Sequence, residues 1–317
     1  MNTKEKVKFL KITSELGAGT RGSSKGFEGL KSAAALKGSS VFFDLPIVTI
    51  KDENDSLIKN INFPNAKRIK SIYEVLLRVK NAVQLELENN NFPILLSGDH
   101  SIAAGTIAGI KSAHPDKKIG VVWIDAHADL HSPYTTPSGN MHGMPIAAAL
   151  GLNNELPKGN QPLPEVVKLW NDIKILGGRA QNIRPESLVY VGIRDTEWQE
   201  DKVIRELKIQ KYSVDFVRHN GGETTGQSIL NKLINCDLIY ISFDVDVLDT
   251  SLSKGTGTPV KNGLFLREVN NLIRTLARNE KVCCFEIVEI NPTIDDKGNY
   301  MAEMGLDVLE NLIANLL

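Results

Sequence analysis

Residues 119–142 read IGVVWIDAHADLHSPYTTPSGNMH, and this stretch decides the predicted fold. It opens with a short apolar run, interrupted only by Gly120, which is typical of a strand buried on both faces. Polar residues follow at alternate positions: Asp125, His127, Asp129 and His131. Because side chains alternate along an extended backbone, the first three are predicted to point to one side if the strand continues.

The polar end of this strand favours a metal site. Two carboxylates and an imidazole crowded together at the end of a buried strand are costly without a compensating cation. A divalent metal supplies that cation. The alternative interpretation is a polar strand end that meets solvent.

Composition narrows the class of protein. The 317 residues are 42% hydrophobic and 24% charged, which is ordinary for a globular protein with a sizeable core. The net charge of -1 argues against a nucleic acid or an acidic membrane surface as the main partner. No apolar run approaches the length of a membrane span, and residues 1–7 lack the apolar core of a signal peptide. The three cysteines are predicted to be reduced core residues, and the protein to be cytoplasmic.

Strand and helix patterns alternate along the chain. The predicted strands are residues 7–13, 41–50, 93–97, 119–125, 188–193, 213–217, 238–243 and 282–288. The predicted helices are residues 66–88, 101–113, 196–207, 225–234, 265–278 and 300–316. This alternation predicts an α/β fold of three α-β-α layers around a mainly parallel sheet of about eight strands. Residues 151–164 are predicted to be a surface loop, so residues 1–317 are expected to form a single domain.

Four of the predicted strands run into polar clusters, and these clusters predict a binding site. The clusters are Gly98-Asp99-His100-Ser101, the stretch from Asp125, Asp244-Val-Asp246, and Glu289-Ile-Asn291-Pro292. In an open parallel sheet, ligands bind outside the carboxyl ends of the strands. A single acidic loop is weak support for a site, but the recurrence at several strand ends of one sheet is much harder to dismiss.

If these clusters converge, they bring together two imidazoles and four carboxylates: His100, Asp125, His127, Asp129, Asp244 and Asp246. Nitrogen and oxygen ligands without a thiolate favour Mn²⁺ over Fe, Co or Zn. Six side chains exceed the need of one catalytic ion, so two ions about 4 Å apart and bridged by carboxylates fit the count. Such a pair lowers the pKa of water between the ions toward about 7, which predicts metal-assisted hydrolysis.

Five blocks resemble the signature blocks of the arginase (ureohydrolase) family, in the same order and with similar spacing. They read GDHS at 98–101, DAHAD at 125–129, SGNMHG at 138–143, SFDVD at 242–246 and EINP at 289–292. The segments LGAGTRG at 16–22 and GTP at 257–259 also match, so the resemblance covers nearly the whole chain. Within the family, the third block is more similar to arginases than to agmatinases. An arginase-like fold is therefore expected.

The resemblance implies two Mn²⁺ ions in each chain. One ion would be held by His100, Asp125, Asp129 and Asp244, and the other by His127, Asp125, Asp244 and Asp246. Asp125 and Asp244 would bridge the ions. A metal-bridging hydroxide would attack the guanidinium carbon of L-arginine and yield L-ornithine and urea. Family members are usually trimers or hexamers, so a homo-oligomer is expected.

The resemblance also implies the remaining site residues. The implied catalytic residues are His142, Glu289 and Asp129, and the implied substrate-binding residues are His131, Ser138, Asn140, Glu197, Glu200, Thr258 and Glu289. His142 would carry a proton to the leaving amine, and Glu289 would pair with the guanidinium group. Ser138 and Asn140 would bind the α-carboxylate.

Two of these pocket positions depart from the family pattern. His131 stands where arginases usually have an asparagine that touches the α-carboxylate, and Glu197 stands where they usually have an aspartate that contacts the α-amino group. The departures leave open the hydrolysis of another guanidino or formimino substrate, such as agmatine, a guanidino acid or formimidoylglutamate. Ser138 and Asn140 favour a substrate with an α-carboxylate, which agmatine lacks.

Two alternatives come from other classes of protein. A non-catalytic metal-binding relative is disfavoured because every expected ligand, the shuttle histidine and the guanidinium glutamate are present. A two-metal phosphoesterase is disfavoured because no basic cluster accompanies the metal residues to neutralise a phosphate.

Overall fold

A single parallel sheet of eight strands forms the centre of the computed structural model, which describes residues 6–155 and 159–316. The strands are β1 (Val7–Ile12), β2 (Ile47–Ile50), β3 (Phe92–Ser97), β4 (Ile119–Ile124), β5 (Leu188–Val191), β6 (Gln210–Tyr212), β7 (Leu238–Asp244) and β8 (Val282–Val288). Their order is β2-β1-β3-β8-β7-β4-β5-β6, and every neighbouring pair is parallel. The prediction of a parallel sheet of about eight strands is confirmed.

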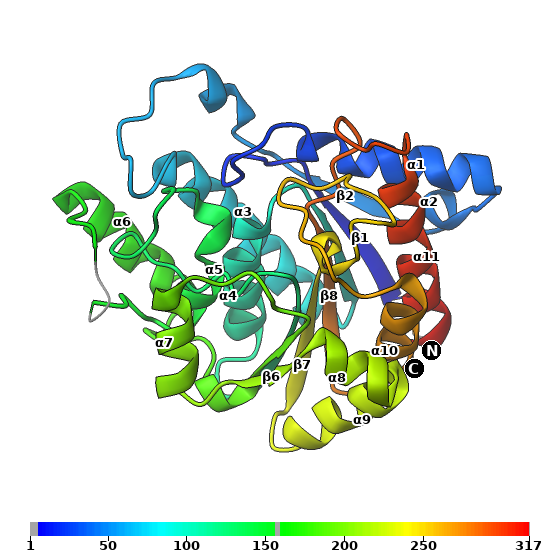
Figure 1. Ribbon diagram of the computed structural model, residues 1–317. Helices are drawn as coiled ribbons and strands as arrows, with labels where there is room; N and C mark the ends of the chain where they lie inside the picture. Colours follow the sequence, from blue (N-terminus) through cyan, green and yellow to red (C-terminus); the bar gives the residue numbers. More distant parts are fainter. Residues whose placement is uncertain (1–5, 156–158, 317) are drawn as a thin grey trace.

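Helices cover both faces of the sheet, which confirms the predicted three layers (Figure 1). One face carries α3 (Ile69–Glu88), α4 (Ala103–Ala113), α5 (Pro145–Ala149), α6 (Pro164–Lys174) and α7 (Trp198–Glu206). The other face carries α1 (Gly26–Lys37), α2 (Val41–Asp44), α8 (Val214–Asn220), α9 (Gly222–Lys232), α10 (Leu266–Ala277) and α11 (Tyr300–Asn315). None of the helices in residues 6–155 and 159–316 is both long and apolar enough to cross a membrane.

The alternation of side chains along the strands produces two separate cores. In β4, Val122 and Ile124 join the core beneath α8 to α11, whereas Val121 and Trp123 join the core beneath α3 to α7. All six residues of β4 are buried, as predicted for a central strand covered on both faces. Each fully buried aliphatic side chain contributes about 1.5–3 kcal/mol of transfer free energy.

Helix α4 lies close against α3 because two of its residues lack a side chain. A Cβ atom at Gly105 would lie 2.8 Å from the Leu76 carbonyl oxygen, and one at Gly109 would lie 2.7 Å from the Val83 Cβ. This close approach fixes the position of the segment between β3 and α4, which contains His100.

One predicted strand is wrong in part, and another is wrong throughout. Residues 41–50 contain the short helix α2 before β2, because Pro46 forces the preceding Leu45 into extended conformation and ends the helical turn there. Residues 213–217 form the N-cap and first turn of α8, and the strand is the preceding β6. Ser213 is the N-cap of α8, since its hydroxyl accepts a hydrogen bond from the Phe216 N–H at 3.1 Å.

Helix α6 begins at Pro164, where the predicted loop of residues 151–164 ends. Proline is favoured at this first helical position because it has no N–H to leave unpaired. Residues 156–158 of that loop lie outside the described part of the chain.

Candidate metal centre and substrate pocket

The four polar clusters follow four adjacent strands in the middle of the sheet, in the order β3, β8, β7 and β4. Because these strands are parallel, their carboxyl ends meet at one edge. His100 follows β3, Asp125 follows β4, Asp244 ends β7, and Glu289 follows β8. The sheet therefore brings together residues that are far apart in the sequence.

The first candidate cation position surrounds the His100 imidazole. Its Nδ1 atom lies 3.0 Å from Asp125 Oδ2, 3.1 Å from Asp129 Oδ2 and 3.2 Å from Asp244 Oδ2. All four residues are buried. Neither His100 Nδ1 nor Asp125 Oδ2 makes a well-aligned hydrogen bond, so two buried polar atoms remain for a cation to satisfy.

The second candidate position surrounds His127. Its Nδ1 atom lies 2.9 Å from Asp246 Oδ2 and 3.5 Å from Asp125 Oδ1. Ligand atoms of Asp125, His127 and Asp246 converge here, as those of His100, Asp125 and Asp129 do at the first position. Asp125 thus faces both positions, one oxygen toward each, as a bridging carboxylate does.

Backbone amides hold three of these carboxylates in place. Asp125 Oδ1 accepts from the His127 N–H at 2.7 Å, Asp244 Oδ1 accepts from the Asp246 N–H at 2.8 Å, and Asp246 Oδ1 accepts from the Ala126 N–H at 3.1 Å. In Asp244 and Asp246, the other oxygen is the one that faces an imidazole. The carboxylates are therefore oriented before any cation binds.

The sequence pattern predicted that these side chains would converge if the strand continued. The strand does not continue, so the convergence has another cause. Strand β4 ends at Ile124, and Asp129 adopts a left-handed backbone with φ of 49°. The turn is closed by the hydrogen bond between the Asp125 carboxylate and the His127 amide. A tight turn, not strand alternation, aims these side chains at a common centre.

Contacts on the far side of each imidazole orient it. His100 Nε2 lies 2.7 Å from Ser242 Oγ, and the ring stacks on Trp123 with centroids 4.0 Å apart. His127 Nε2 lies 3.7 Å from the exposed carboxylate of Asp195. In both residues these contacts leave Nδ1 directed at the carboxylates, an arrangement typical of metal-binding histidines.

The pKa values of the histidines and aspartates in the metal-free centre indicate that it suits a cation. Burial alone would lower the pKa of His100, but the carboxylates around it raise that pKa well above its usual value. The pKa of His127 is also raised, because the charges of Asp246 and Asp125 outweigh the effect of its burial. Burial and the charge of Asp125 raise the pKa of Asp129 to about 7. Excess carboxylate with imidazole nitrogen and no thiolate suits a hard or borderline divalent ion.

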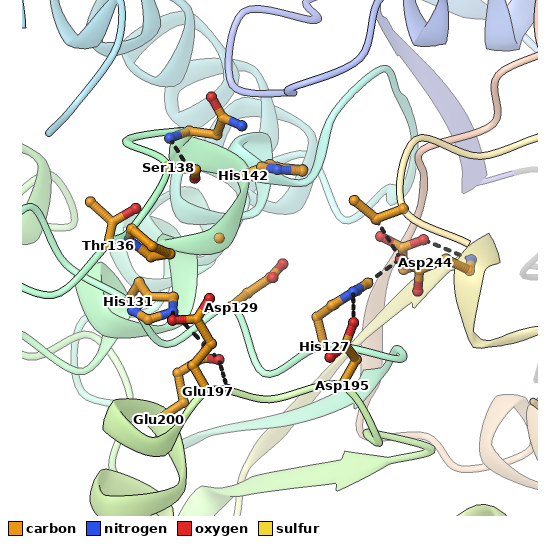
Figure 2. A pocket seen from close by; sticks show the side chains of 15 residues that line it. His127, Asp129, His131, Thr136, Ser138, His142, Asp195, Glu197, Glu200 and Asp244 are labelled. Carbon is orange, nitrogen blue, oxygen red and sulfur yellow. Dashed lines mark hydrogen bonds and ion pairs between the residues drawn. The ribbon is translucent and has the colours of Figure 1, made fainter. Parts of the chain in front are cut away.

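A cavity of about 250 Å³ opens beside both positions (Figure 2). His127 and Asp244 lie on one side of it, and His131, Thr136 and Ser138 lie on the other. Its lining includes most of the predicted substrate-binding residues: His131, Ser138, Asn140, Glu197, Glu200 and Thr258. Of these, Thr258 donates a hydrogen bond to Asp246 Oδ2 at 3.0 Å.

One end of the cavity is acidic. Glu197 and Glu200 form the capping box that begins α7, where the Glu197 N–H donates to Glu200 Oε2 at 3.1 Å. His131 Nε2 lies 3.6 Å from a carboxylate oxygen of each. Burial raises the pKa of Glu200 to about 7, although amide hydrogen bonds from Leu130 and Glu197 oppose this.

The opposite end presents hydrogen-bond donors. The Asn140 N–H donates to Ser138 Oγ at 3.1 Å, so the Ser138 hydroxyl proton remains free for an acceptor. Lys67 Nζ donates to Asn140 Oδ1 at 3.0 Å and adds a positive charge there. Lys67 was not predicted as a site residue, because it fell within the predicted helix of residues 66–88, far from any motif.

His142 and Glu289 form a pair next to the first cation position. His142 Nδ1 lies 3.1 Å from Glu289 Oε1, and that oxygen also accepts from the His100 N–H at 3.1 Å. Burial would lower the pKa of His142, but Glu289, with smaller contributions from Asp129 and Asp99, raises that pKa to about 9. Glu289 has a left-handed φ of 63°, a conformation that is uncommon outside glycine and often found at functional sites.

Comparison with known proteins matches nearly the whole chain to one family. The family model described as "Arginase family" matches residues 6–314. The arginase of Bacillus subtilis is 34% identical over 274 residues, which cover 86% of this chain and 83% of that protein. 

Solved structures agree with this match. The arginase of Bacillus caldovelox superposes with a TM-score of 0.82 at 30% identity and covers 99% of each chain. The Entamoeba histolytica arginase in complex with L-ornithine superposes with a TM-score of 0.81 at 28% identity, over 98% of each chain.

Proposed function

The chain belongs to the arginase family and is a hydrolase, and from that premise we propose that it converts L-arginine and water to L-ornithine and urea. The observation that carries this proposal is the pair of converging ligand groups that share Asp125. Asp129 of the first group, and His127 and Asp246 of the second, line one cavity with the predicted substrate-binding residues. The L-ornithine complex of the Entamoeba histolytica relative supports the choice of substrate.

We propose two Mn²⁺ ions as the cofactor. The residues that would hold them are His100, Asp125, Asp129 and Asp244 at the first position, and His127, Asp125, Asp244 and Asp246 at the second. Asp244 Oδ2 faces His100, which supports its place at the first position. When bound, two such ions lower the pKa of water toward about 7 and supply a nucleophile near neutral pH.

The two ends of the cavity suit the two charges of an α-amino acid. Ser138 and Asn140, with Lys67 behind them, offer donors and positive charge to the α-carboxylate. Glu197 and Glu200 offer negative charge to the α-ammonium group. This division supports L-arginine over agmatine, which has no carboxylate to place at the first end.

His142 and Glu289 suit the reacting end of the substrate. The Glu289 carboxylate accepts from an amide and lies beside an imidazole, so it can also accept N–H groups from a planar guanidinium. Its neighbour His142 has a raised pKa of about 9 and therefore holds a proton at neutral pH. That proton can pass to the leaving amine, which is general acid catalysis.

Urea release tests the proposal. The purified protein is loaded with Mn²⁺ and supplied with L-arginine, agmatine or a short guanidino acid. We expect urea from L-arginine and much less from the other two. Urea from agmatine or the guanidino acid alone would keep the hydrolytic class but reject the substrate. If none releases urea, formimidoylglutamate is tested through the release of formamide, and failure there favours a non-catalytic relative.

Three broader inferences remain predictions. A single domain over residues 1–317 is supported by the single sheet, which runs from β1 near the start to β8 near the end. A trimer or hexamer rests on the family resemblance. A cytoplasmic location rests on the composition and the reduced cysteines.

A further inference from the structure

Arg194 lies at the carboxyl edge of the sheet, just after β5, and its side chain is half-buried. Its guanidinium group donates four hydrogen bonds, each to a backbone carbonyl oxygen. The acceptors are Gly192 at 3.1 Å, Asp246 at 3.0 Å, Val260 at 2.8 Å and Lys261 at 2.9 Å. These carbonyls belong to the ends of β5 and β7 and to the connection between β7 and α10. One side chain therefore ties three segments of the chain together.

The main chain of Arg194 holds the neighbouring turn after β4. Its N–H donates to the Ala126 carbonyl oxygen at 2.8 Å. The Ala126 N–H donates to Asp246 Oδ1 at 3.1 Å, and the guanidinium group of Arg194 donates to the Asp246 carbonyl oxygen. These three hydrogen bonds form a closed ring, which fixes both the backbone and one carboxylate oxygen of Asp246.

The other carboxylate oxygen of Asp246 is oriented by the loop of residues 258–261. Thr258 donates a hydrogen bond to Asp246 Oδ2 at 3.0 Å. The same oxygen lies 2.9 Å from His127 Nδ1, so it is the oxygen that faces the second cation position. Arg194 binds the carbonyls of residues 260 and 261 and thereby holds the loop that carries this hydroxyl.

The contact suits an arginine and not a lysine. A guanidinium group is planar and presents five N–H donors in a fixed fork, so it can bind carbonyl oxygens of several segments at once. A lysine ammonium keeps the charge but concentrates its donors at one point. Arg194→Lys would therefore leave some of the four carbonyls without their donor and loosen the segments.

We propose that Arg194 is a positioning residue for the second cation position. It holds the backbone of Asp246 and the loop of residues 258–261, so that Asp246 Oδ2 stays directed at His127. The inference rests on the proposed function because it assumes that Asp246 is a cation ligand. It concerns the affinity of one ion, so it is tested by binding and not by turnover.

Binding of Mn²⁺ to three proteins tests the proposal: the wild type, Arg194→Lys and Arg218→Lys. The electron paramagnetic resonance signal of free Mn²⁺ gives the binding curve of each protein in its metal-free form. Arg218 is a matched control, because its guanidinium group donates to a carbonyl oxygen of the same connection, that of Gly263 at 2.7 Å. Its other hydrogen bonds go to the Glu268 carboxylate. Both substitutions keep the positive charge and remove the fork of donors.

We expect Arg194→Lys to weaken one of the two ions by about 10- to 100-fold, the usual effect of removing an outer-shell partner of a metal ligand. The other ion should keep its affinity, because its position is built around His100 and the hydrogen bonds of Arg194 lead to Asp246. Arg218→Lys should bind both ions as the wild type does. Equal affinities in the wild type and Arg194→Lys, or equal losses in both variants, would overturn the proposal.

A double-mutant cycle shows whether Arg194 acts through Asp246. Asp246→Ala removes the ligand that Arg194 is proposed to position. Adding Arg194→Lys to that variant should therefore cause no further loss of affinity for the remaining ion. A further loss as large as the one that Arg194→Lys causes by itself would overturn the proposal, because Arg194 would then act on the first position.

Two further measurements guard against misfolding. Thermal unfolding of the metal-free proteins shows whether each variant is folded. Thr258→Val removes the hydroxyl that donates to Asp246 Oδ2 and keeps the branched shape of the side chain. It should weaken the same ion as Arg194→Lys does, and it decides the matter if Arg194→Lys does not fold. Unchanged binding of both ions by Thr258→Val would contradict the proposal, because the loop would then not orient Asp246.

The outcomes separate this inference from the proposed function. A wild type that binds two ions but releases no urea rejects the function and leaves the binding comparison valid. A wild type that releases urea, with no difference between Arg194→Lys and Arg218→Lys, rejects only the role of Arg194. A wild type that binds no Mn²⁺ rejects both.

Discussion

Asp125 is the residue that joins the two candidate cation positions. Its Oδ2 faces the His100 imidazole and its Oδ1 faces the His127 imidazole. The His127 backbone N–H also donates a hydrogen bond to Oδ1. A single substitution at the shared edge of the positions should therefore affect both ions. Asp244 is the second candidate bridge, and the amide of Asp246 holds its Oδ1 in the same way.

We predict that Asp244→Ala abolishes urea release and lowers the manganese content. The substitution removes the oxygen 3.2 Å from His100 Nδ1 and the hydrogen bond that holds the Asp246 amide. Manganese is measured by elemental analysis after dialysis. Asp249→Ala is the control, since Asp249 accepts from the amides of Ser251 and Gly263 and belongs to neither group of converging ligand atoms. Two ions retained in Asp244→Ala would contradict the assignment.

Because the pKa of His142 is raised, we predict that the free energy of unfolding of the metal-free protein depends on pH. Glu289, helped by Asp129 and Asp99, raises the pKa of His142 in the folded state to about 9, above the value of about 6.5 in an unfolded chain. The folded state therefore binds the proton more tightly. The resulting stabilisation is complete below about pH 6.5 and is lost as the pH rises through about 9.

His142→Asn should accordingly lower the free energy of unfolding more at about pH 6 than at about pH 10. Guanidinium unfolding of the metal-free wild type and variant at both pH values measures the difference. An equal loss at both would mean that the pair with Glu289 does not favour the protonated imidazole.

Some residues of the centre could be predicted from the local sequence, and others could not. Histidines and aspartates at strand ends stand out because such groups are expensive to bury without a partner. Ser242 lies within an otherwise apolar strand, and its local sequence does not predict its contact with His100 Nε2. That contact depends on the order of the strands, which the local sequence does not specify.

At the level of elements, the contact between α3 and α4 positions the first cation ligand. Gly105→Ala would place a Cβ 2.8 Å from the Leu76 carbonyl oxygen, and backbone cannot move aside as a flexible side chain can. Overpacking costs about 1–3 kcal/mol, which outweighs the gain of up to about 1 kcal/mol in helix propensity.

We therefore predict that Gly105→Ala lowers the free energy of unfolding, measured by chemical denaturation. Gly159→Ala serves as the control, because a Cβ there meets nothing within 4 Å and its φ is not left-handed. A Gly105→Ala protein as stable as the control would show that α4 can move away from α3.

The helix α8 illustrates what element prediction missed. Residues 213–217 contain two valines and a phenylalanine, which favour a strand by composition. Ser213 at the N-cap and Asp215 in the first turn instead favour a helix start. Capping chemistry was the better local signal.

At the scale of the whole molecule, the candidate centre ties together separate parts of the sheet. Its six ligand candidates come from the ends of β3, β4 and β7, which span residues 92 to 244. Cations that bind there therefore bind only the folded chain. A ligand at 100 times its dissociation constant stabilises such a state by about 2.7 kcal/mol.

Removal of metal should consequently lower the thermal midpoint of unfolding. We predict that Mn²⁺ raises the midpoint and that a chelator reverses this rise. Calorimetry measures both changes. Mg²⁺ at the same concentration should shift the midpoint less, because two of the ligands are imidazoles and Mg²⁺ prefers oxygen. Equal shifts with both ions would indicate nonspecific binding to surface carboxylates.

The sequence by itself determined the fold class, the family and the residues able to bind a cation. Buried parallel strands require continuous apolar runs, and polar groups that interrupt such runs must serve a ligand or lie at strand ends. These are local requirements, so a local pattern reveals them. The predicted family was confirmed by its match to residues 6–314.

Only the tertiary structure decided the arrangement of those residues. The order β3-β8-β7-β4 places the clusters side by side, and a left-handed turn at Asp129 aims its carboxylate at His100. Ser242 on β7 lies beside His100, and Lys67, which precedes α3, lies beside Asn140. Contacts of this kind depend on strand order and register, which the balance of packing over the whole chain sets and no short segment encodes.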